Sequence, residues 1–592
     1  MATEKIIIAG AGPAGLTAGH LLVREGRSPL VLEQRDRVGG IACTEEYNGF
    51  FFDMGGHRFF SRHAAPRKIW EELLGDDFLT RERLSRIYYR GTFFDYPLKA
   101  LNALAGIGPF GATAMAASYV RWRIFPHPEV VNFEQWVTNR FGRKLFRTFF
   151  KSYTEKVWGI PCSELQAEWA AQRIRDLSLR KAILGVFTPQ KKRTRTLIDS
   201  FRYPRRGPGM LWEAMQRSVE AGGGAVRLGT RVVAVHHDNG LVRGVTVERD
   251  GAREEIAAHT LVSTMPVTSL VQRLDPAPPA EVLEAAGRLS YRDFLTVCLI
   301  VDREEIFPDQ WIYVHDPDVR MGRIQNYRNW SPEMCPEPGR TGLGLEYFCS
   351  KGDDLWTMPD DELVALGTRE LDAMGLVPAG LVSDATVYRV PKAYPMYDAG
   401  YAEALDVLRR HLAGYENLQT IGRNGLFRYN NMDHSMLTAM AAADHLVTGS
   451  GEDVWSVNDE QVYHESAPEE ALADGEHQAA RALESVFQRL DSIALGGALG
   501  ILGGTLIVLL TLAQLAVGSP EAGGMLGLLG QYLPGYSVSL PGALAGLANG
   551  LVLGFALGWT GATVRNALTA LVWMALGFRA GRPFGGQFLD YI

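Results

Sequence analysis

Three glycines near the start of the chain constrain its fold more than any other feature. The run Gly10-Ala-Gly12-Pro-Ala-Gly15 follows an apolar segment, residues 5–9, and opens a helical pattern over residues 14–25. A second apolar segment, residues 29–33, follows and ends on Glu33. This spacing allows a tight turn, a close backbone approach to a pyrophosphate and tight helix-on-strand packing. The order predicts a βαβ unit that binds a dinucleotide, with phosphates at the helix N-terminus and Glu33 at the ribose.

Two uncharged stretches near the C-terminus predict membrane-spanning helices. They cover residues 493–517 and 541–564, and each is long enough to cross about 30 Å of hydrocarbon. The alternative is a pair of buried core helices. Glycine recurs every four residues in both, at Gly496, Gly500 and Gly504 and at Gly542, Gly546, Gly550, Gly554 and Gly558. Small residues on one helix face allow close packing in lipid, so we expect a two-helix hairpin or pairing between chains.

Basic residues predict the topology of these spans. Arg565, Arg579 and Arg582 follow the second span, whereas the connecting loop holds only Glu521. Loops and termini rich in lysine and arginine next to a membrane span usually stay in the cytosol. We therefore expect a multi-pass protein of the cytoplasmic (inner) membrane with its catalytic part and its C-terminus cytosolic.

Composition excludes several classes of protein. With 46% apolar and 21% charged residues, the chain of 592 residues is typical of a globular protein. A net charge of −7 provides no general attraction for nucleic acid, so no nucleic-acid partner is expected. The five cysteines are scattered, which predicts a reduced cytosolic chain without disulfides or a metal site: Cys43, Cys162, Cys298, Cys335 and Cys349.

The order of the remaining patterns predicts how the chain is divided. Strand patterns recur at residues 225–236, 241–248, 260–264, 311–314 and 343–348, and residues 98–184 are mostly helical in pattern. The predicted fold class is α/β: a Rossmann-like domain with helical and antiparallel-sheet inserts plus C-terminal transmembrane helices. The nucleotide-binding domain takes residues 1–98, 201–290 and 386–450. A helical insert takes 99–200, a sheet insert 291–385, an acidic connector 451–490, and the hairpin with a cytosolic tail 491–592.

Two other stretches are compatible with membrane contact. Residues 100–120 carry no charge and precede Arg121 and Arg123. They fit either two core helices broken at Pro109 or a membrane-contacting segment. The basic run at residues 191–195 fits either a solvated loop or a contact with anionic headgroups.

Residues 33–40, Glu-Gln-Arg-Asp-Arg-Val-Gly-Gly, resemble the E-x-R-x-x-x-G-G extension of one flavoprotein group. The group contains amine oxidases, protoporphyrinogen oxidases, phytoene desaturases and UDP-galactopyranose mutases. Residues 52–57 resemble its next flavin-side segment, and residues 421–423 precede a helix expected near Asp433. The resemblance implies FAD as cofactor, bound by Gly10, Gly12, Gly15, Glu33, Arg35, Gly39, Gly40, Gly56, His57, Gly422, Arg423 and Met432.

Further segments resemble UDP-galactopyranose mutases, in order over about residues 5–445. Gly55-Gly56-His57-Arg-Phe59 resembles their G-P-H-x-F segment. Residues 133–165 resemble the helical domain of these mutases. Gly322-Arg323-Ile324 resembles their arginine segment, and Tyr394-Pro395 resembles their tyrosine segment. Residues 422–433 resemble the ending G-R-x-G-x-x-R-Y-x-x-M-D.

This resemblance implies a substrate site and a reaction. Trp158 would stack on uracil, Arg323, Tyr394 and Tyr429 would hold a diphosphate, and Tyr153 would line the same cleft. His57 and Arg323 would be the catalytic residues of a pyranose–furanose mutase that needs reduced FAD, with NAD(P)H a candidate external reductant. The alternative readings are a core tryptophan, a surface ion-paired arginine and ordinary buried tyrosines.

Some positions depart from the mutase pattern. Phe60 replaces a histidine, Asn431 replaces an acid, and a second diphosphate arginine has no secure counterpart, although Arg173 and Arg175 are near.

The membrane hairpin suggests a polyprenyl-phosphate sugar or a membrane glycosyltransferase as partner, in cell-envelope glycan synthesis. A homodimer is a further expectation. The rival hypotheses are a membrane flavin oxidoreductase acting on an amine, porphyrin or isoprenoid, and a flavin-binding scaffold.

Overall fold

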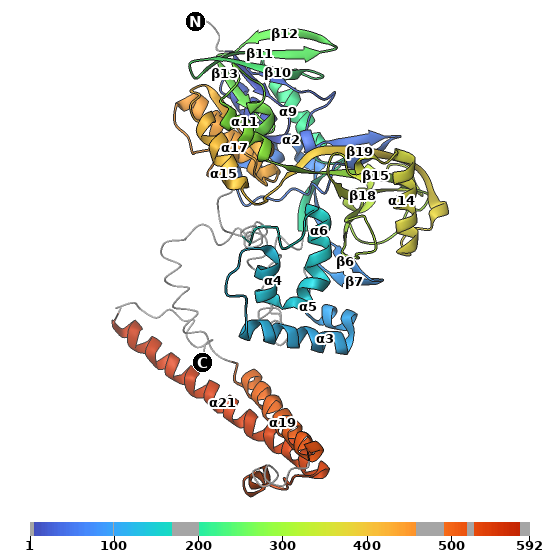
Figure 1. The fold of residues 1–592 in the computed structure, drawn as a ribbon, viewed down its shortest axis with the longest axis vertical. Helices are drawn as coiled ribbons and strands as arrows, with labels where there is room; N and C mark the ends of the chain where they lie inside the picture. Colours follow the sequence, from blue (N-terminus) through green and yellow to red (C-terminus); the bar gives the residue numbers. More distant parts are fainter. Residues whose placement is uncertain are drawn as a thin grey trace. The chain divides into compact units, whose positions relative to one another are not determined.

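The computed structural model describes residues 5–96, 98, 100–167, 200–457, 491–517 and 526–579 (Figure 1). The chain divides into two units, unit 1 (Met1–Ala467) and unit 2 (Pro468–Ile592), and each is described by itself. The predicted basic run at residues 191–195, together with Arg173 and Arg175, lies outside the described residues.

A parallel sheet of five strands forms the nucleotide-binding part of unit 1. Its order is β20 (Leu418–Thr420), β13 (Thr260–Ser263), β1 (Ile6–Ala9), β2 (Leu30–Leu32) and β9 (Ala225–Arg227). Helices α1 (Pro13–Arg24), α9 (Gly209–Ala221) and α17 (Met432–Thr448) share one apolar core with this sheet. Three distant segments thus build one sheet, which confirms the predicted Rossmann-like α/β fold.

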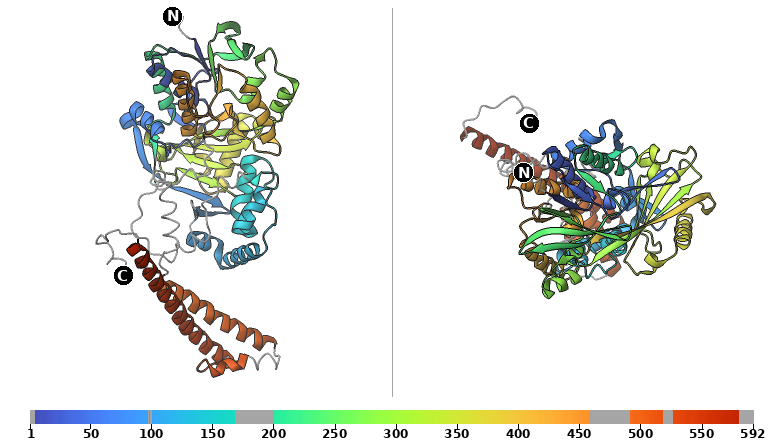
Figure 2. Two further views of the ribbon diagram at one scale, coloured as in Figure 1. Left: turned by 90° about the vertical axis from the view of Figure 1, so that its left-hand side faces the viewer. Right: turned by 90° about the horizontal axis from the view of Figure 1, so that it is seen from above.

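A smaller sheet lies beside the parallel one (Figure 2). It has the order β12 (Ala252–Ala257), β11 (Leu241–Arg249), β10 (Arg231–Asp238) and β14 (Leu274–Asp275). The strand predicted over residues 225–236 is in fact two strands, β9 and β10, which belong to different sheets. The chain turns between them at Gly229, whose φ of 63° is left-handed and suits glycine.

A sheet of seven strands forms the second layer of unit 1. Its order is β19 (Val382–Pro395), β15 (Tyr291–Val301), β18 (Thr341–Cys349), β17 (Arg323–Asn326), β16 (Trp311–Val314), β6 (Ser85–Tyr89) and β7 (Thr92–Asp95). Helix α14 (Asp360–Ala373) shares an apolar core with one face. The sheet is larger than the predicted insert 291–385, because β6 and β7 join it through a parallel pairing of β6 with β16 and β19 continues to Pro395. Local sequence patterns do not reveal such long-range pairing.

The helical part of unit 1 is described up to residue 167. It consists of α3 (Ala100–Ile124), α4 (Phe133–Phe141), α5 (Arg143–Leu145), a π-helical turn (Phe146–Lys151) and α6 (Ser152–Trp158). The backbone of α3 is broken at Gly108, whose φ is 77°. The predicted break at Pro109 therefore occurs one residue earlier, as expected because the residue before a proline avoids helical geometry.

Unit 2 contains a hairpin of two long helices, α19 (Ser492–Val517) and α21 (Leu540–Arg579). Both are long and apolar enough to cross a membrane, and only 17% and 22% of their most apolar windows are buried. That exposure disagrees with the core-helix alternative. The two glycine rows face each other within one chain: a Cβ on Gly554 would lie 2.7 Å from Cα of Gly500, and one on Gly558 would lie 2.8 Å from Cα of Gly496. Glycine is therefore required for this close backbone approach.

Candidate active site

The three fingerprint glycines form a cradle at the N-terminus of α1. A Cβ on Gly10 would lie 2.1 Å from Thr264 Oγ1, and one on Gly15 would lie 1.9 Å from the Gly10 carbonyl. Gly12 caps α1, and among the described side chains none caps that first turn, so its N–H groups are available to a ligand. Gly10 and Gly12 line a large cavity. An anionic diphosphate such as that of FAD fits this cradle, because it is free of side chains and at the positive end of a helix dipole.

The acidic end of β2 lies next to the cradle. The Glu33 carboxylate is buried and accepts hydrogen bonds from the backbone N–H of Ala11 (2.8 Å) and Arg35 (3.0 Å). The Arg35 guanidinium pairs with the buried Glu45 at 2.5 Å and donates to the Gly40 carbonyl at 3.2 Å. A Cβ on Gly40 would lie 3.1 Å from Cα of Gly12, so the predicted Gly39-Gly40 pair passes against the cradle. The structure thus brings all these predicted FAD-binding residues together.

His57 lies on the flavin-side segment and lines the same cavity. Its Nε2 is 2.7 Å from the Met54 carbonyl oxygen, to which Nε2–H donates. Burial lowers the pKa of His57 to about 4, so the ring is neutral at physiological pH. The neighbouring Gly56 is required because a Cβ there would overlap the ring of Trp311 at 1.7 Å.

Arg323 is held on the sheet face that lines the cavity. It begins β17, where its backbone lies opposite Tyr313 of β16 and Glu346 of β18. The guanidinium pairs with the buried Glu346 carboxylate at 3.0 Å. It also donates to the hydroxyl oxygens of Tyr153 (2.7 Å) and Tyr394 (3.4 Å). The alternative of a surface ion pair is therefore wrong, since this ion pair is buried.

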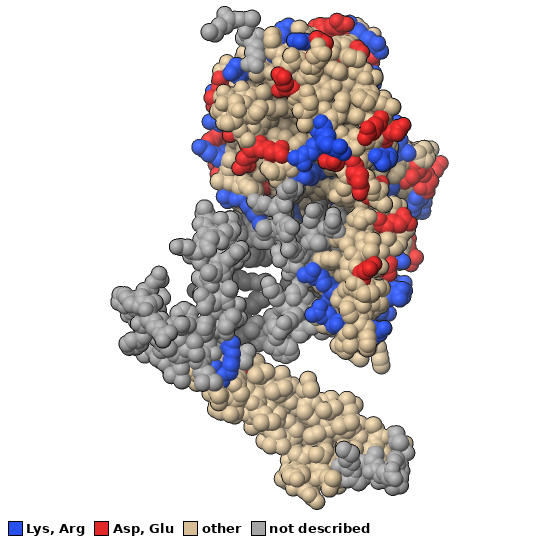
Figure 3. Space-filling view, turned by 60° about the vertical axis from the view of Figure 1, so that its left-hand side comes forward, with Lys and Arg blue, Asp and Glu red and all other residues tan. Residues whose placement is uncertain are grey.

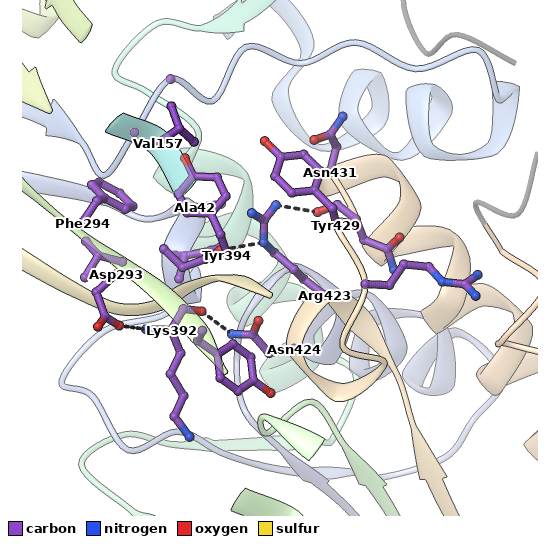
Figure 4. A pocket seen from close by; sticks show the side chains of 18 of the residues that line it. Ala42, Val157, Asp293, Phe294, Lys392, Tyr394, Arg423, Asn424, Tyr429 and Asn431 are labelled. Atoms are coloured by element: carbon purple, nitrogen blue, oxygen red, sulfur yellow. Dashed lines mark hydrogen bonds between the residues drawn. The ribbon is translucent and has the colours of Figure 1, made fainter. Parts of the chain in front are cut away.

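A second guanidinium faces the same region. Arg423 donates through Nε to the Ala393 carbonyl (2.8 Å) and through Nη1 to the Asn430 carbonyl (3.1 Å). Figure 4 shows it beside the rings of Tyr394 and Tyr429, whose centroids lie 4.9 and 4.1 Å from its Cζ. The two rings are stacked with centroids 5.7 Å apart. Arg423 thus supports both tyrosines as well as contributing its charge.

An irregularity in β19 positions Tyr394. The register with β15 shifts between Arg292 and Phe294, and Lys392 adopts a left-handed φ of 53°. The Asp293 carboxylate accepts the Lys392 N–H at 2.5 Å and holds this bulge (Figure 4). A bulge re-aims the side chains that follow it. This bulge therefore directs the Tyr394 side chain into the cavity.

The other predicted residues have mixed outcomes. Trp158 lines the cavity but is only 2% exposed, with its ring edge-on to Tyr394, so uracil stacking stays a prediction. Gly422 packs against Ala14 of α1, and Met432 begins α17 as predicted. Asn431, at the position of the family acid, caps α17, and Phe60 lines the cavity.

The cavity has a volume of about 2340 Å³ and reaches beyond the predicted site. It extends from the cradle past Arg323 to the apolar side chains of α3. Sequence reasoning missed three residues of its wall, Trp311, Tyr313 and His315. It also missed Glu346, the counter-ion of Arg323. The i, i+2, i+4 spacing of the three aromatic residues, which begins on the strand predicted at residues 311–314 and continues one residue beyond it, is the signal that could have revealed them.

Comparison with known proteins defines the class. A family model for flavin containing amine oxidoreductase matches residues 13–446, and the chain belongs to this family. The class of this protein is therefore a flavoprotein of the amine oxidase superfamily.

Similar proteins span several chemistries. The chain is 26% identical over 277 residues to 15-cis-phytoene desaturase of Arabidopsis thaliana, covering 42% of this chain and 46% of that protein. It is 27% identical over 308 residues to the putative flavin-containing monoamine oxidase AofH of Mycobacterium tuberculosis, covering 49% and 64%. The chain thus spans about half the length of these curated relatives. Reduced UDP-galactopyranose mutase matches with a TM-score of 0.68 and 22% identity over 78% of this chain and 100% of that one, which shows a shared fold.

Proposed function

We propose that the protein is an FAD-dependent mutase that interconverts the pyranose and furanose forms of a phosphate-linked sugar. The observation that carries the proposal is the pair of guanidinium groups, Arg323 and Arg423, with the hydroxyls of Tyr153, Tyr394 and Tyr429 near them in one cavity. Two guanidinium forks and rigid hydroxyls are the donor set that a diphosphate requires.

The charge of this cluster favours an anionic substrate. Among the described residues, Glu346 is the one carboxylate that pairs with either guanidinium. The cluster therefore keeps an excess positive charge in a largely buried setting, where electrostatic interactions are strong. An ammonium substrate of the kind amine oxidases use would be repelled there, whereas a phosphate would be attracted.

The buried tyrosine hydroxyls can donate hydrogen bonds to a phosphate. Burial raises the pKa of Tyr153 and Tyr394, so both hydroxyls stay protonated. The Tyr153 oxygen already accepts from Arg323, which leaves its own proton for another acceptor. A phosphate oxygen placed there would receive hydrogen bonds from arginine and tyrosine together.

These residues would also assist departure of the phosphate from the anomeric carbon. Negative charge on the leaving phosphate is stabilised by fixed donors that need no rearrangement. Reduced FAD, when bound, supplies the electron density for an isomerisation without net oxidation. His57 is neutral and oriented by Met54, so it adds no positive charge on the flavin side.

A membrane oxidoreductase is the second candidate. It is favoured by the family and by the apolar part of the cavity near α3, which would suit a hydride donor with an apolar body. In either case we propose that the hairpin of unit 2 holds the enzyme at the inner membrane with unit 1 in the cytosol.

Anaerobic NMR of the reaction mixture distinguishes the two candidates. The purified enzyme, reduced with dithionite, is incubated with UDP-galactose, other sugar nucleotides or polyprenyl-phosphate sugars. A change of ring form at constant mass, absent with the oxidised enzyme, supports the mutase. Unchanged sugars with every donor, together with flavin bleaching by an apolar substrate under anaerobic conditions, would replace it by the oxidoreductase.

A further inference from the structure

The cavity wall changes from ionic to apolar along one row of the seven-stranded sheet. Cross-strand neighbours in this row are Glu346, Arg323, Tyr313, Ile87 and Phe94. Side chains paired across strands share one sheet face. A ligand lying along the row would therefore have its anionic end at Arg323 and an apolar end toward Ile87, which packs with Met115 of α3.

Aromatic side chains line the path between these two ends. Trp311 and Tyr313 alternate along β16, His315 follows the end of that strand, and all three side chains line the cavity. The rings of Trp311 and Tyr313 are stacked at 5.4 Å, and His315 is stacked on Tyr153 at 4.6 Å. The ring of Tyr96 continues the path at 4.8 Å from Tyr313. Flat aromatic faces of this kind offer a large apolar contact area, which suits the hydrocarbon chain of a lipid.

Helix α3 forms the far wall of this apolar arm, which we define as the part of the cavity between β16 and α3. Its wall residues are Ala103, Ile107, Met115, Ala116, Tyr119 and Val120. Ala116 and Val120 are at the same time exposed to solvent. The arm therefore reaches the molecular surface at α3, so a chain too long for the cavity could leave it there.

The surface at this opening is apolar and bordered by positive charge. Phe110 is 92% exposed, Ile124 62%, Phe125 60% and Val131 59%. Between residues 100 and 150 the chain has two acids against six exposed basic residues: Arg121, Arg123, Arg140, Arg143, Lys144 and Arg147. Figure 3 shows blue side chains on both flanks of the tan lower end of unit 1, at the level of α3–α5 in Figure 1. Large exposed apolar side chains on a soluble surface are a liability unless something covers them.

We propose that α3 and residues 124–131 dock into an anionic bilayer surface and that the arm behind them receives the polyprenyl chain of a lipid-phosphate substrate. The proposal rests on the proposed function and names its substrate class as a sugar carried on a polyprenyl phosphate. Arg323 and its tyrosines bind the phosphate. The aromatic side chains of Trp311, Tyr313 and His315 hold the first part of the polyprenyl chain, and the rest of that chain stays in the bilayer.

Charge and covalent structure favour a bilayer over a protein partner. An apolar face bordered by lysine and arginine matches the acyl boundary and the anionic headgroups of a membrane. The same chain carries two helices apolar enough to cross a membrane, so unit 1 is covalently joined to a candidate anchor. Binding of a water-soluble sugar nucleotide would not account for the exposed apolar side chains on α3 and residues 124–131.

Fluorescence quenching in vesicles tests the docking surface. All five native cysteines are buried, so one introduced cysteine on the full chain is labelled alone. Bimane on Ile124→Cys, in vesicles of phosphatidylcholine and phosphatidylglycerol, should be quenched by doxyl-labelled lipid at least threefold more than bimane on Asp250→Cys. Asp250 lies at an exposed turn between β11 and β12 and serves as the control. Equal quenching at the two positions would overturn the docking surface.

Photo-crosslinking tests the arm. A polyprenyl phosphate with a diazirine in its chain, irradiated with the oxidised holoenzyme, should label peptides of α3 and β16. The Ala116→Trp variant should lose at least fivefold of this labelling, because position 116 lines the arm. Ala117→Trp is the matched control, since Ala117 is exposed but does not line the cavity. Labelling confined to other peptides, or equal in both variants, would overturn the proposal.

A comparison of polyprenyl phosphate with polyprenol tests the phosphate-binding end of the cavity. Together with the labelling experiment, it separates the lipid arm from the proposed mutase activity. Polyprenol without phosphate should label the arm several-fold less, because Arg323 has no anion to bind; equal labelling would overturn the assigned orientation. The labelling requires neither reduced flavin nor a sugar. A protein that binds the lipid but moves no sugar ring contradicts the mutase alone, whereas one that converts UDP-galactose without lipid labelling contradicts the lipid arm alone.

Discussion

Arg323 and Glu346 lie directly opposite each other on β17 and β18, with Nη1 and Oε2 3.0 Å apart and the carboxylate fully buried. Glu346 also accepts a hydrogen bond from Gln325 Nε2 at 2.6 Å. The ion pair therefore holds the arginine fork in one orientation at the cavity wall. The buried ion pair thus keeps the Arg323 guanidinium fixed while it faces the cavity.

Removing only the arginine should destabilise unit 1. Arg323→Met leaves the buried Glu346 charge without its cation, which costs about 3–5 kcal/mol in comparable buried pairs. Thermal unfolding in detergent should show a lowered Tm for this variant. The double variant Arg323→Met/Glu346→Gln should recover much of that loss. A double variant as unstable as the single one would show that packing, and not charge, sets the effect.

The two stacked tyrosines should matter for binding and not for folding. Tyr394→Phe and Tyr429→Phe each remove one hydroxyl while the ring contacts with Arg423 remain. Hydrogen bonds to charged groups contribute about 1.5–3 kcal/mol, so kcat/KM for a phosphate-linked substrate should fall by about 10- to 150-fold. Tyr415→Phe is the control, because Tyr415 does not line the cavity. Unchanged kinetics in both variants would place the phosphate elsewhere.

Flavin content should depend on the open cradle at Gly12. A Cβ at this position meets only the Gly40 Cα at 3.8 Å, so a larger side chain is tolerated by the fold yet narrows the cradle. Gly12→Val should therefore lower the ratio of flavin to protein absorbance at least tenfold with little change in far-UV circular dichroism. Gly287→Ala, where a Cβ meets nothing within 4 Å, is the control. Full flavin content in Gly12→Val would contradict the assigned phosphate site.

Stability between pH 6.5 and 4 should depend on His57. Its pKa is lowered by burial to about 4, so over this window the unfolded chain binds a proton that the folded chain does not. The His57 contribution makes the protein less stable as the pH falls from 6.5 to 4. Burial raises the pKa of Asp53 to about 7, which acts with the opposite sign, so the difference between wild type and His57→Gln isolates the histidine.

The difference is measured as Tm against pH for both proteins. His57→Gln should have the shallower fall of Tm below pH 6.5. His259→Gln, at an exposed position, should follow the wild type. Parallel curves for wild type and His57→Gln would show that His57 does not titrate in this way.

The hairpin should depend on its glycine rows. A Cβ on Gly554 would lie 2.4 Å from the Leu499 carbonyl oxygen, so Gly554→Leu forces the helices apart. Ser492 and Thr563 have hydroxyls 3.1 Å apart, and cysteines at both positions should form a disulfide across the hairpin. Its yield should drop several-fold in Gly554→Leu. It should persist in Gly561→Leu, where a Cβ meets nothing within 4 Å, and equal yields would refute the packed seam.

Short-range features of this protein were predictable from its sequence. The spacing of Gly10, Gly12 and Gly15 after an apolar run determines a strand, a turn and a helix, because each step depends on neighbours in the chain. Glu33 and the start of α17 follow from patterns of the same kind. The length of the uncharged stretches likewise determined the two helices of unit 2, since their apolarity is a property of composition.

Only the tertiary structure decided the shape of the cavity. Arg323 meets Glu346 and Tyr313 because three separate strands pair in one register, and the pairing of β6 with β16 adds the apolar end from another part of the chain. The bulge at Lys392 that aims Tyr394 depends on Asp293 of a different strand. Hydrogen bonds between strands that are far apart in the sequence determine these positions, and no local sequence pattern predicts which strands pair.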